Sequence, residues 1–229
     1  MSQIGDLLSQ YNVLAAFWMT IKLTALSAVG ALIIGTVVAV MRVSPIAVLR
    51  GVGTSYVNIL RNTPLTLIIV FCNLGLSVTL GLHLANLDSN TFIVDNNVRL
   101  AVLGLSLYHA SFVAEAIRSG VNTVPVGQAE AARALGLGFL PTLRFVILPQ
   151  AFRGAITPLG NTLIALTKNS TVAAVIGVAE ASYLMRAMIE FSPDLLFFTF
   201  FVMAIGFVIL TLPVGLAFTT LSRRLAVRR

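Results

Sequence analysis

The stretch Leu195–Leu212 reads LLFFTFFVMAIGFVILTL and contains no charged residue. A helix that spans a bilayer needs about 20 mostly apolar residues, whereas the strands of a membrane barrel alternate apolar and polar residues. Neither this stretch nor Ala28–Met41 alternates, so both are predicted to be membrane-spanning helices. The whole chain is 58% hydrophobic and 10% charged, with a mean hydropathy of +0.97. Because soluble domains carry roughly 25% charged residues, this composition excludes a water-soluble protein.

Five segments are long and apolar enough to be predicted as spanning helices. They are Leu14–Met41, Pro64–Leu84, Val98–Ile117, Ala155–Leu184 and Leu195–Leu221. The segments follow each other closely, so residues 1–229 are expected to form a single transmembrane domain. The predicted fold class is therefore all-α, a polytopic membrane protein with about five transmembrane helices.

The positions of the charged residues predict the orientation of the chain. Its net charge is +7. Arg99 and Arg186 lie on the opposite side from most of the arginines, which gather between segments one and two, between segments three and four, and after segment five. These are Arg42, Arg50, Arg133, Arg144, Arg153, Arg223, Arg224, Arg228 and Arg229. The positive-inside rule places them in the cytoplasm, so the amino terminus is expected outside and the carboxyl terminus inside. This distribution accounts for the basic charge without a nucleic-acid partner.

The third connection, from about residue 122 to residue 153, differs from the others because it contains helix-forming and helix-ending signals. It includes VPVGQAEAARALGLGFLPTLRFVILPQAFR, from Val124 onward. The Ala-rich part Gln128–Leu135 favours a short helix, which the glycines that follow are expected to end. Pro141 favours the first turn of a second short helix, and Pro149 is expected to interrupt that helix.

This connection resembles the cytoplasmic signature of permease subunits of bacterial ATP-binding-cassette importers. In that family EAA is followed by Gly after three residues and, nine residues later, by I-x-L-P. Here Glu130, Ala131 and Ala132 are followed by Gly136 at that distance, and then by Val146, Leu148 and Pro149. Val146 replaces the usual Ile and keeps its β-branched shape.

Other motifs look like the branch of this family that imports polar amino acids. They are Gly127-Gln128, Gln150, Arg61-Asn62-Thr63-Pro64 before segment two and Lys168-Asn169-Ser170-Thr171 in segment four. The resemblance covers about Leu23 to Leu221 and is greatest to the permeases of glutamate transport systems. It implies a type I importer permease fold in the bacterial cytoplasmic membrane, with glutamate as the expected substrate.

The resemblance also implies that the chain functions together with other subunits. The connection around 122–153 is expected to dock into an ATP-hydrolysing subunit through Gln128, Glu130, Ala131, Ala132, Arg133, Gly136, Leu148 and Pro149. The alternative is an amphipathic helix that lies on the bilayer surface. A second permease subunit, homologous or identical, and an extracytoplasmic amino-acid-binding protein are the other expected partners.

The chain is not expected to be an enzyme. A phosphate-binding loop needs Gly-Lys-Ser or Gly-Lys-Thr, but the only lysines, Lys22 and Lys168, follow Ile21 and Thr167. ATP and magnesium are therefore expected in the partner ATPase, and no catalytic residue, metal site or cofactor is expected in this chain.

Lys168 is the first candidate for the substrate pathway. A charge at membrane depth costs about 2.5–3.5 kcal/mol on insertion scales and is a candidate for function. Together with Asn169, Ser170 and Thr171 it forms a polar break between two apolar stretches. A cation there suits a substrate carboxylate, and a helix that restarts at Ser170 or Thr171 would point backbone N–H groups at an anion. Alternatively, Lys168 pairs with Glu180 or snorkels outward.

A second group of pathway candidates consists of Arg61, Asn62, Thr63 and Glu115. The first three precede Pro64, where the chain is expected to form a hinge, a cavity wall or a plain interfacial break. Glu115 is near the inner end of segment three. It is expected to pair with Arg118 or Arg61, or to act as a gate or in coupling.

Two other functions fit a polytopic chain of this kind. A secondary transporter driven by an ion gradient would need coupling carboxylates in the middle of the membrane, for which Glu115 is the acidic candidate. A membrane scaffold without transport would need neither the polar break at Lys168 nor a folded cytoplasmic connection.

Overall fold

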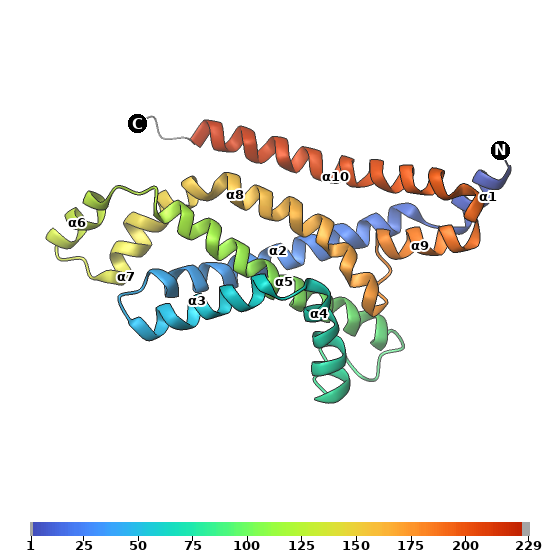
Figure 1. The fold of residues 1–229 in the computed structure, drawn as a ribbon, viewed down its shortest axis with the longest axis horizontal. Coiled ribbons are helices and arrows are strands. Elements are labelled where there is room, and N and C mark those ends of the chain that lie inside the picture. The colour runs from blue at the N-terminus through green and yellow to red at the C-terminus, as the bar shows by residue number, and fades with distance from the viewer. Residues whose placement is uncertain (1, 226–229) are drawn as a thin grey trace. The chain divides into compact units, whose positions relative to one another are not determined.

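The computed structural model describes residues 2–225, which form helices and contain no strand, as predicted (Figure 1). The long helices are α2 (Val13–Val43), α5 (Phe92–Val121), α8 (Leu148–Asn169) and α10 (Leu196–Leu225). The shorter ones are α1 (Ser2–Gln10), α3 (Ala47–Asn62), α4 (Leu65–Val70), α6 (Val126–Ala134), α7 (Phe139–Thr142) and α9 (Ala181–Phe191). Two π-helical segments, η1 (Phe71–Thr79) and η2 (Leu143–Ile147), and two 3-10 segments, η3 (Ser170–Ile176) and η4 (Pro193–Leu195), complete the described helical structure.

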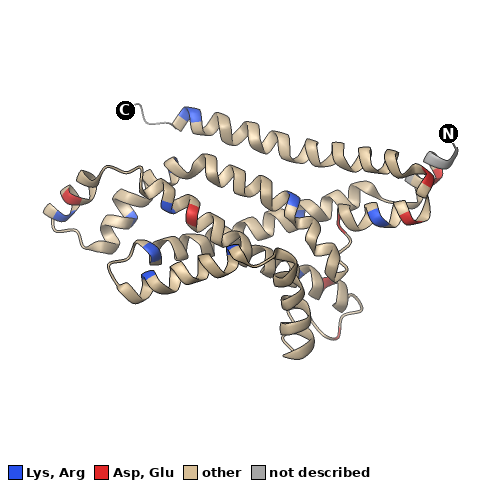
Figure 2. Ribbon diagram, in the orientation of Figure 1, with Lys and Arg blue, Asp and Glu red and all other residues tan. Residues whose placement is uncertain are grey.

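Several helices are long and apolar enough to cross a membrane. By length and composition these are Val13–Val43, Phe92–Val121 and Pro193–Leu225, and two bent helix pairs raise the number from three to five. Along α10 the charged residues are confined to the carboxyl-terminal turns, where Arg223 and Arg224 lie (Figure 2). Arg228 and Arg229 lie outside the described residues. The described helices therefore belong to a multi-pass membrane protein.

The predicted second segment, Pro64–Leu84, was wrong as an independent span. Its helical part consists of six residues in α4 and nine in η1, fewer than a bilayer requires. It reaches the length of a span only together with α3, from which it is sharply bent. Pro64 breaks the helix because proline lacks an N–H group and disfavours helical geometry in the residue before it. The polar residues of α3 concealed this helix in the sequence.

The predicted fourth segment, Ala155–Leu184, is interrupted, but at Gly177 and not at the predicted position around Ser170. Helix α8 passes directly into η3, which ends at Gly177 with φ of +78°. A new helix, α9, then begins, and the buried carboxylate of Glu180 accepts hydrogen bonds from the backbone N–H groups of Ser182 and Tyr183 at 2.8 and 2.9 Å. Such an N-cap satisfies amides that a helix start leaves without partners.

The chain divides into two compact units. The first unit comprises Met1–Gly30, Thr63–Ser106 and Ala165–Pro213, and the second comprises Ala31–Asn62, Leu107–Ile164 and Val214–Arg229. Leu7, Ala181, Met188 and Met203 form a buried cluster in the first unit. The buried cluster of the second unit consists of Ala31, Val38, Ala39, Val57, Val113, Ala114 and Ile117, from helices α2, α3 and α5. Apolar packing between helices therefore organises each unit from within.

A stripe of small residues on α2 packs against α5. The stripe consists of Ser27, Ala31, Gly35 and Ala39, all of which are buried. In the first unit the hydroxyl of Ser27 donates to the carbonyl of Val102 at 3.5 Å. In the second unit a Cβ atom at Gly35 would lie 2.6 Å from the side chain of Val113. Small side chains thus permit close helix packing here, and this stripe contacts another helix of its own chain.

The connection between α5 and α8 begins with the predicted short helix. Helix α6 covers Val126–Ala134, close to the predicted Gln128–Leu135. It ends with Gly136 at φ of +81°, where the N–H of Leu137 bonds to the carbonyl of Ala132 at 3.1 Å. This is the left-handed helix end that glycine favours. The second short helix, α7, has Pro141 in its first turn, also as predicted.

The predicted interruption at Pro149 was wrong, because the helix continues through it. The chain stays helical from α7 through η2 into α8, and Pro149 is the second residue of α8. In the turn before it, the N–H of Leu148 bonds to the carbonyl of Leu143, five residues earlier. A π-helical turn of this kind accommodates a proline, which cannot donate a backbone hydrogen bond.

Candidate functional site

The residues predicted to contact an ATPase lie on α6 and at the start of α8, in the second unit. Helix α6 lies beyond the ends of α5 and α8 (Figure 1). Ala132 is buried and Leu148 half-buried, and the others are exposed: Gln128, Glu130, Ala131, Arg133, Gly136 and Pro149. Helix α6 is therefore anchored by one small apolar side chain and leaves its polar residues accessible.

Large apolar side chains are exposed on the same connection. Leu135 is 82% exposed, and Val126, Leu140 and Phe145 are each about 70% exposed. Beside them lies a cavity of about 780 Å³ between the connection and the ends of α2 and α5. It is lined by Val43, Pro45, Val121, Asn122, Val124, Pro125, Val126, Ala129, Arg133, Leu137, Gly138, Phe139, Thr142, Leu143 and Ile147. Exposed apolar surface of this kind is typical of a protein contact or a lipid contact.

The first group of pathway candidates, around Lys168, belongs to the first unit. Lys168 is exposed, and its ammonium group forms no ion pair with any carboxylate among residues 2–225. The predicted alternative, a pair with Glu180, is therefore absent there, and Glu180 caps α9 instead.

No helix restarts at Ser170 or Thr171, which corrects the prediction of free N–H groups at this break. Asn169 keeps right-handed helical geometry, and η3 continues directly from α8. The hydroxyls of Ser170 and Thr171 donate to the carbonyls of Thr167 and Lys168 at 2.8 and 2.7 Å. Lys168 stays the predicted contact for a substrate carboxylate at this position.

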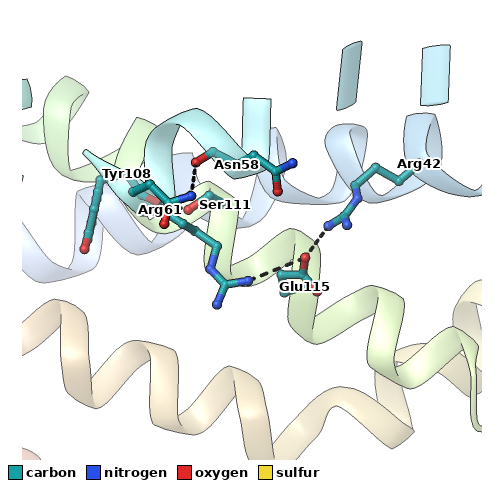
Figure 3. Close-up of polar contacts among 7 residues, drawn as sticks. Arg42, Asn58, Arg61, Tyr108, Ser111 and Glu115 are labelled. Carbon is teal, nitrogen blue, oxygen red and sulfur yellow. Dashed lines mark hydrogen bonds and ion pairs between the residues drawn. The ribbon is translucent and has the colours of Figure 1, made fainter. Parts of the chain in front are cut away.

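The second group of candidates, in the second unit, forms a charged cluster around Glu115 (Figure 3). One carboxylate oxygen, Oε1 of Glu115, lies 2.6 Å from Nη1 of Arg42 and 3.6 Å from Nη1 of Arg61. The predicted pair with Arg61 is thus present, and Arg118 makes no ion pair among residues 2–225. Arg42 was missed, because it precedes Glu115 by 73 positions and no local spacing connects them.

The two arginines of the cluster have different surroundings. The side chain of Arg42 is only 7% exposed, and its Nε atom is buried without a hydrogen-bond partner in the described part of the chain. The side chain of Arg61 is 46% exposed, and its guanidinium lies 5.5 Å from the centre of the Phe112 ring. Arg42 is therefore the tightly held partner of Glu115, and Arg61 is the loosely held one.

The residues beside Arg61 end helix α3. The side-chain amide of Asn62 donates to the carbonyl of Asn58 at 2.7 Å, within the last turn of α3. Thr63 follows in the first unit, so the boundary between the units crosses the Arg61–Pro64 motif. The predicted role of this motif, as a hinge, a cavity wall or a plain interfacial break, stays a prediction.

Comparison with known proteins gives consistent matches along nearly the whole chain. A model of the family described as binding-protein-dependent transport system inner membrane component matches residues 13–227. The glutamate transport system permease protein GluC of Corynebacterium glutamicum is 61% identical over 218 residues, which cover 95% of this chain and 96% of that protein. GluC of Corynebacterium efficiens is 58% identical with the same coverage. A crystal structure of an amino acid ABC transporter with histidines matches with a TM-score of 0.78 and 28% identity, covering 98% of this chain and 96% of that chain.

Proposed function

Because the chain belongs to the family of binding-protein-dependent transport system inner membrane components, we propose that it is the membrane-spanning permease subunit of an ATP-driven importer. The proposed cargo is a polar amino acid, and glutamate is the proposed substrate, because two permeases of glutamate transport systems are 61% and 58% identical to this chain. The chain itself carries out no covalent chemistry.

The exposed helix α6 is the observation that carries this proposal. The family signature Glu130-Ala131-Ala132 lies on this helix, which a left-handed turn at Gly136 ends. Small residues let a partner's backbone approach closely, and Glu130 and Arg133 offer charged groups for polar contacts. The exposed Leu135 and Leu140 supply apolar surface for the same contact. The start of α8 at Leu148 and Pro149 continues α7 without a break, so a displacement of the connection is passed to a long helix.

The partner at this surface is an ATP-binding-cassette ATPase, which holds ATP and magnesium. Neither Lys22 nor Lys168 has the glycine-rich context of a phosphate-binding loop, so the energy source lies outside this chain. A second permease subunit completes the pathway, and an extracytoplasmic binding protein delivers the amino acid. The proposed orientation puts the α6 connection and Arg223–Arg224 in the cytoplasm and the amino terminus outside, and the positive-inside rule supports it.

Transport driven by an ion gradient is the competing function, and the Glu115 cluster argues against it. A coupling carboxylate must be able to take up and release its ion. Glu115 is instead held at 2.6 Å by the buried guanidinium of Arg42, so its charge is already compensated.

Co-purification with candidate ATPase subunits in detergent tests the proposal. Gly136→Asp places a side chain at φ of +81°, and Glu130→Lys reverses a charge on α6. Both variants are expected to lose the ATPase during purification. Recovery of the ATPase equal to that of the unmodified chain would contradict the docking surface. The ATPase activity of the reconstituted complex with a panel of amino acids then identifies the substrate, and the largest stimulation is expected with glutamate.

A further inference from the structure

The Glu115 cluster contains more positive than negative charge. Arg42 and Arg61 both approach Oε1 of Glu115, and no other carboxylate among residues 2–225 lies within 4 Å of either guanidinium. Arg42 is the closer of the two, at 2.6 Å compared with 3.6 Å for Arg61, and its side chain is nearly fully buried. The carboxylate is thus neutralised by Arg42, and one cationic group, that of Arg61, is left over.

The position of Arg61 makes this surplus charge available to a ligand. Its side chain is 46% exposed, and Glu115 is the one carboxylate among residues 2–225 within 4 Å of it. Charged groups within a membrane protein face a water-filled cavity or the protein interior, not lipid. The ring of Phe112, 5.5 Å away, supports the guanidinium on one side without supplying a counter-charge. The guanidinium has five N–H donors. Its contact with Glu115, at 3.6 Å, is long, so donors are available to an anion that approaches the exposed side.

We propose that Arg61 binds the side-chain carboxylate of an acidic amino acid, and that Glu115 is the internal carboxylate which the substrate displaces from it. The proposal rests on the importer function proposed above. When a substrate carboxylate binds Arg61, Glu115 keeps its 2.6 Å partner Arg42. The bound carboxylate would thus neutralise the surplus charge of Arg61, while Glu115 remains paired with Arg42.

The arrangement favours acidic over neutral substrates for a physical reason. A guanidinium binds a carboxylate through two parallel charge-assisted hydrogen bonds, which an amide cannot match. Glutamate and glutamine both carry an α-carboxylate, so the difference lies in the side chain. The side-chain amide of glutamine has no charge with which to displace Glu115 from Arg61. Glu115 therefore competes with the substrate for Arg61, and a neutral side chain does not displace it.

Charge rescue at position 61 tests the proposal in the complete transporter. Cys72, the only cysteine of the chain, is buried and is replaced by alanine, and the partner subunits are cysteine-free. Arg61→Cys is then reconstituted and its uptake of glutamate measured. Uptake is expected to fall at least tenfold. A positively charged aminoethyl methanethiosulfonate reagent is expected to restore it, and a negatively charged sulfonatoethyl reagent is not. Equal rescue by both reagents, or wild-type uptake without either, would overturn the proposal.

Ligand protection gives a second measurement on the same variant. Glutamate is expected to slow the reaction of Arg61→Cys with the uncharged methyl methanethiosulfonate, whereas glutamine at the same concentration is not. Arg118→Cys is the matched control, because Arg118 is exposed on α5 three residues from Glu115 and makes no ion pair among residues 2–225. Its modification is expected to be equally fast with and without glutamate. Equal protection of both cysteines, or of neither, would contradict a site at Arg61.

Two further substitutions at position 61 test the proposal if the complex with Arg61→Cys does not assemble. Arg61→Lys keeps the positive charge, and Arg61→Gln removes it at similar size. Uptake of glutamate is expected to be at least tenfold faster with Arg61→Lys than with Arg61→Gln, and equal rates would overturn the proposal. Failure of the unmodified complex to transport glutamate would instead contradict the proposed function, so the two outcomes are distinguishable.

Discussion

Arg42 and Glu115, which are 73 positions apart, form an ion pair of 2.6 Å between the end of α2 and α5 in the second unit. The side chain of Arg42 is 7% exposed and that of Glu115 33%, so the arginine end of this pair is shielded from water. Removing the carboxylate from such a pair is costly, since the buried arginine is left without a partner and without solvent. The pair therefore fastens α2 to α5 close to the connection that carries α6.

Glu115→Gln should destabilise the chain because it leaves the buried guanidinium of Arg42 without a counter-charge. Hydrogen bonds to charged groups contribute about 1.5–3 kcal/mol, and a loss of this size should lower the thermal unfolding midpoint in detergent by several degrees. Arg118→Gln, three residues away on the same helix, removes a charge that has no ion-pair partner among residues 2–225. It should leave the midpoint unchanged. Equal midpoints for Glu115→Gln and Arg118→Gln would show that the pair does not stabilise the fold.

Gly136 and Gly138 should respond differently to the same substitution. Neither has an atom within 4 Å of an added Cβ, but Gly136 has φ of +81° and Gly138 has φ of −68°. Left-handed backbone costs an L-residue about 1–2 kcal/mol, so Gly136→Ala should distort the end of α6. The ATPase should be recovered with Gly138→Ala and depleted with Gly136→Ala in the same co-purification. Identical recovery would mean that the turn does not position the docking surface.

The close crossing of α5 and α8 should not tolerate a side chain at Gly120. An added Cβ would lie 2.0 Å from the backbone carbonyl oxygen of Ala151, which cannot rotate away. Overpacking of this kind costs about 1–3 kcal/mol, so Gly120→Ala should lower the unfolding midpoint. Gly51→Ala is the control, because Gly51 is on α3 with open space around it. Alanine there should be neutral or stabilising, and a loss of stability at Gly51 equal to that at Gly120 would contradict the packing argument.

Lys168 should be required for uptake but not for assembly. Its side chain is exposed and without an ion pair in the described part of the chain, so Lys168→Ala removes a charge that stabilises no visible neighbour. Uptake of glutamate should be lost while the ATPase and the second permease still co-purify. Lys168→Arg, which keeps the charge, should retain part of the uptake. Wild-type uptake by Lys168→Ala would remove Lys168 from the pathway.

Periodicity and composition predicted the parts of the fold that are apolar over a long distance. The segments at Leu14–Met41 and Leu195–Leu221 agree with α2 and α10 within a few residues, because an unbroken apolar run of that length has one stable structure in a bilayer. The family signature also located α6. The likeness to a solved amino acid ABC transporter, with a TM-score of 0.78, confirms the predicted permease fold.

The sequence was less informative where polar residues and helix breaks occur together. Helix α3 was missed because Arg50, Asn58 and Arg61 make it look like a connection. The continuation of the helix through Pro149 depends on a π-helical turn, which no composition rule predicts. The pair between Arg42 and Glu115 depends on tertiary packing between distant positions. Local patterns do not contain such information.

Uptake of glutamate by proteoliposomes tests the central claim, that this permease is driven by an ATPase bound to α6, most directly. The complex of permease subunits, ATPase and binding protein is compared with the permease subunits alone, with ATP inside the vesicles or with an imposed sodium or proton gradient. We predict uptake only with the complete complex and internal ATP, irrespective of the gradient. Uptake by the permease subunits alone, driven by an ion gradient without ATP, would contradict the account.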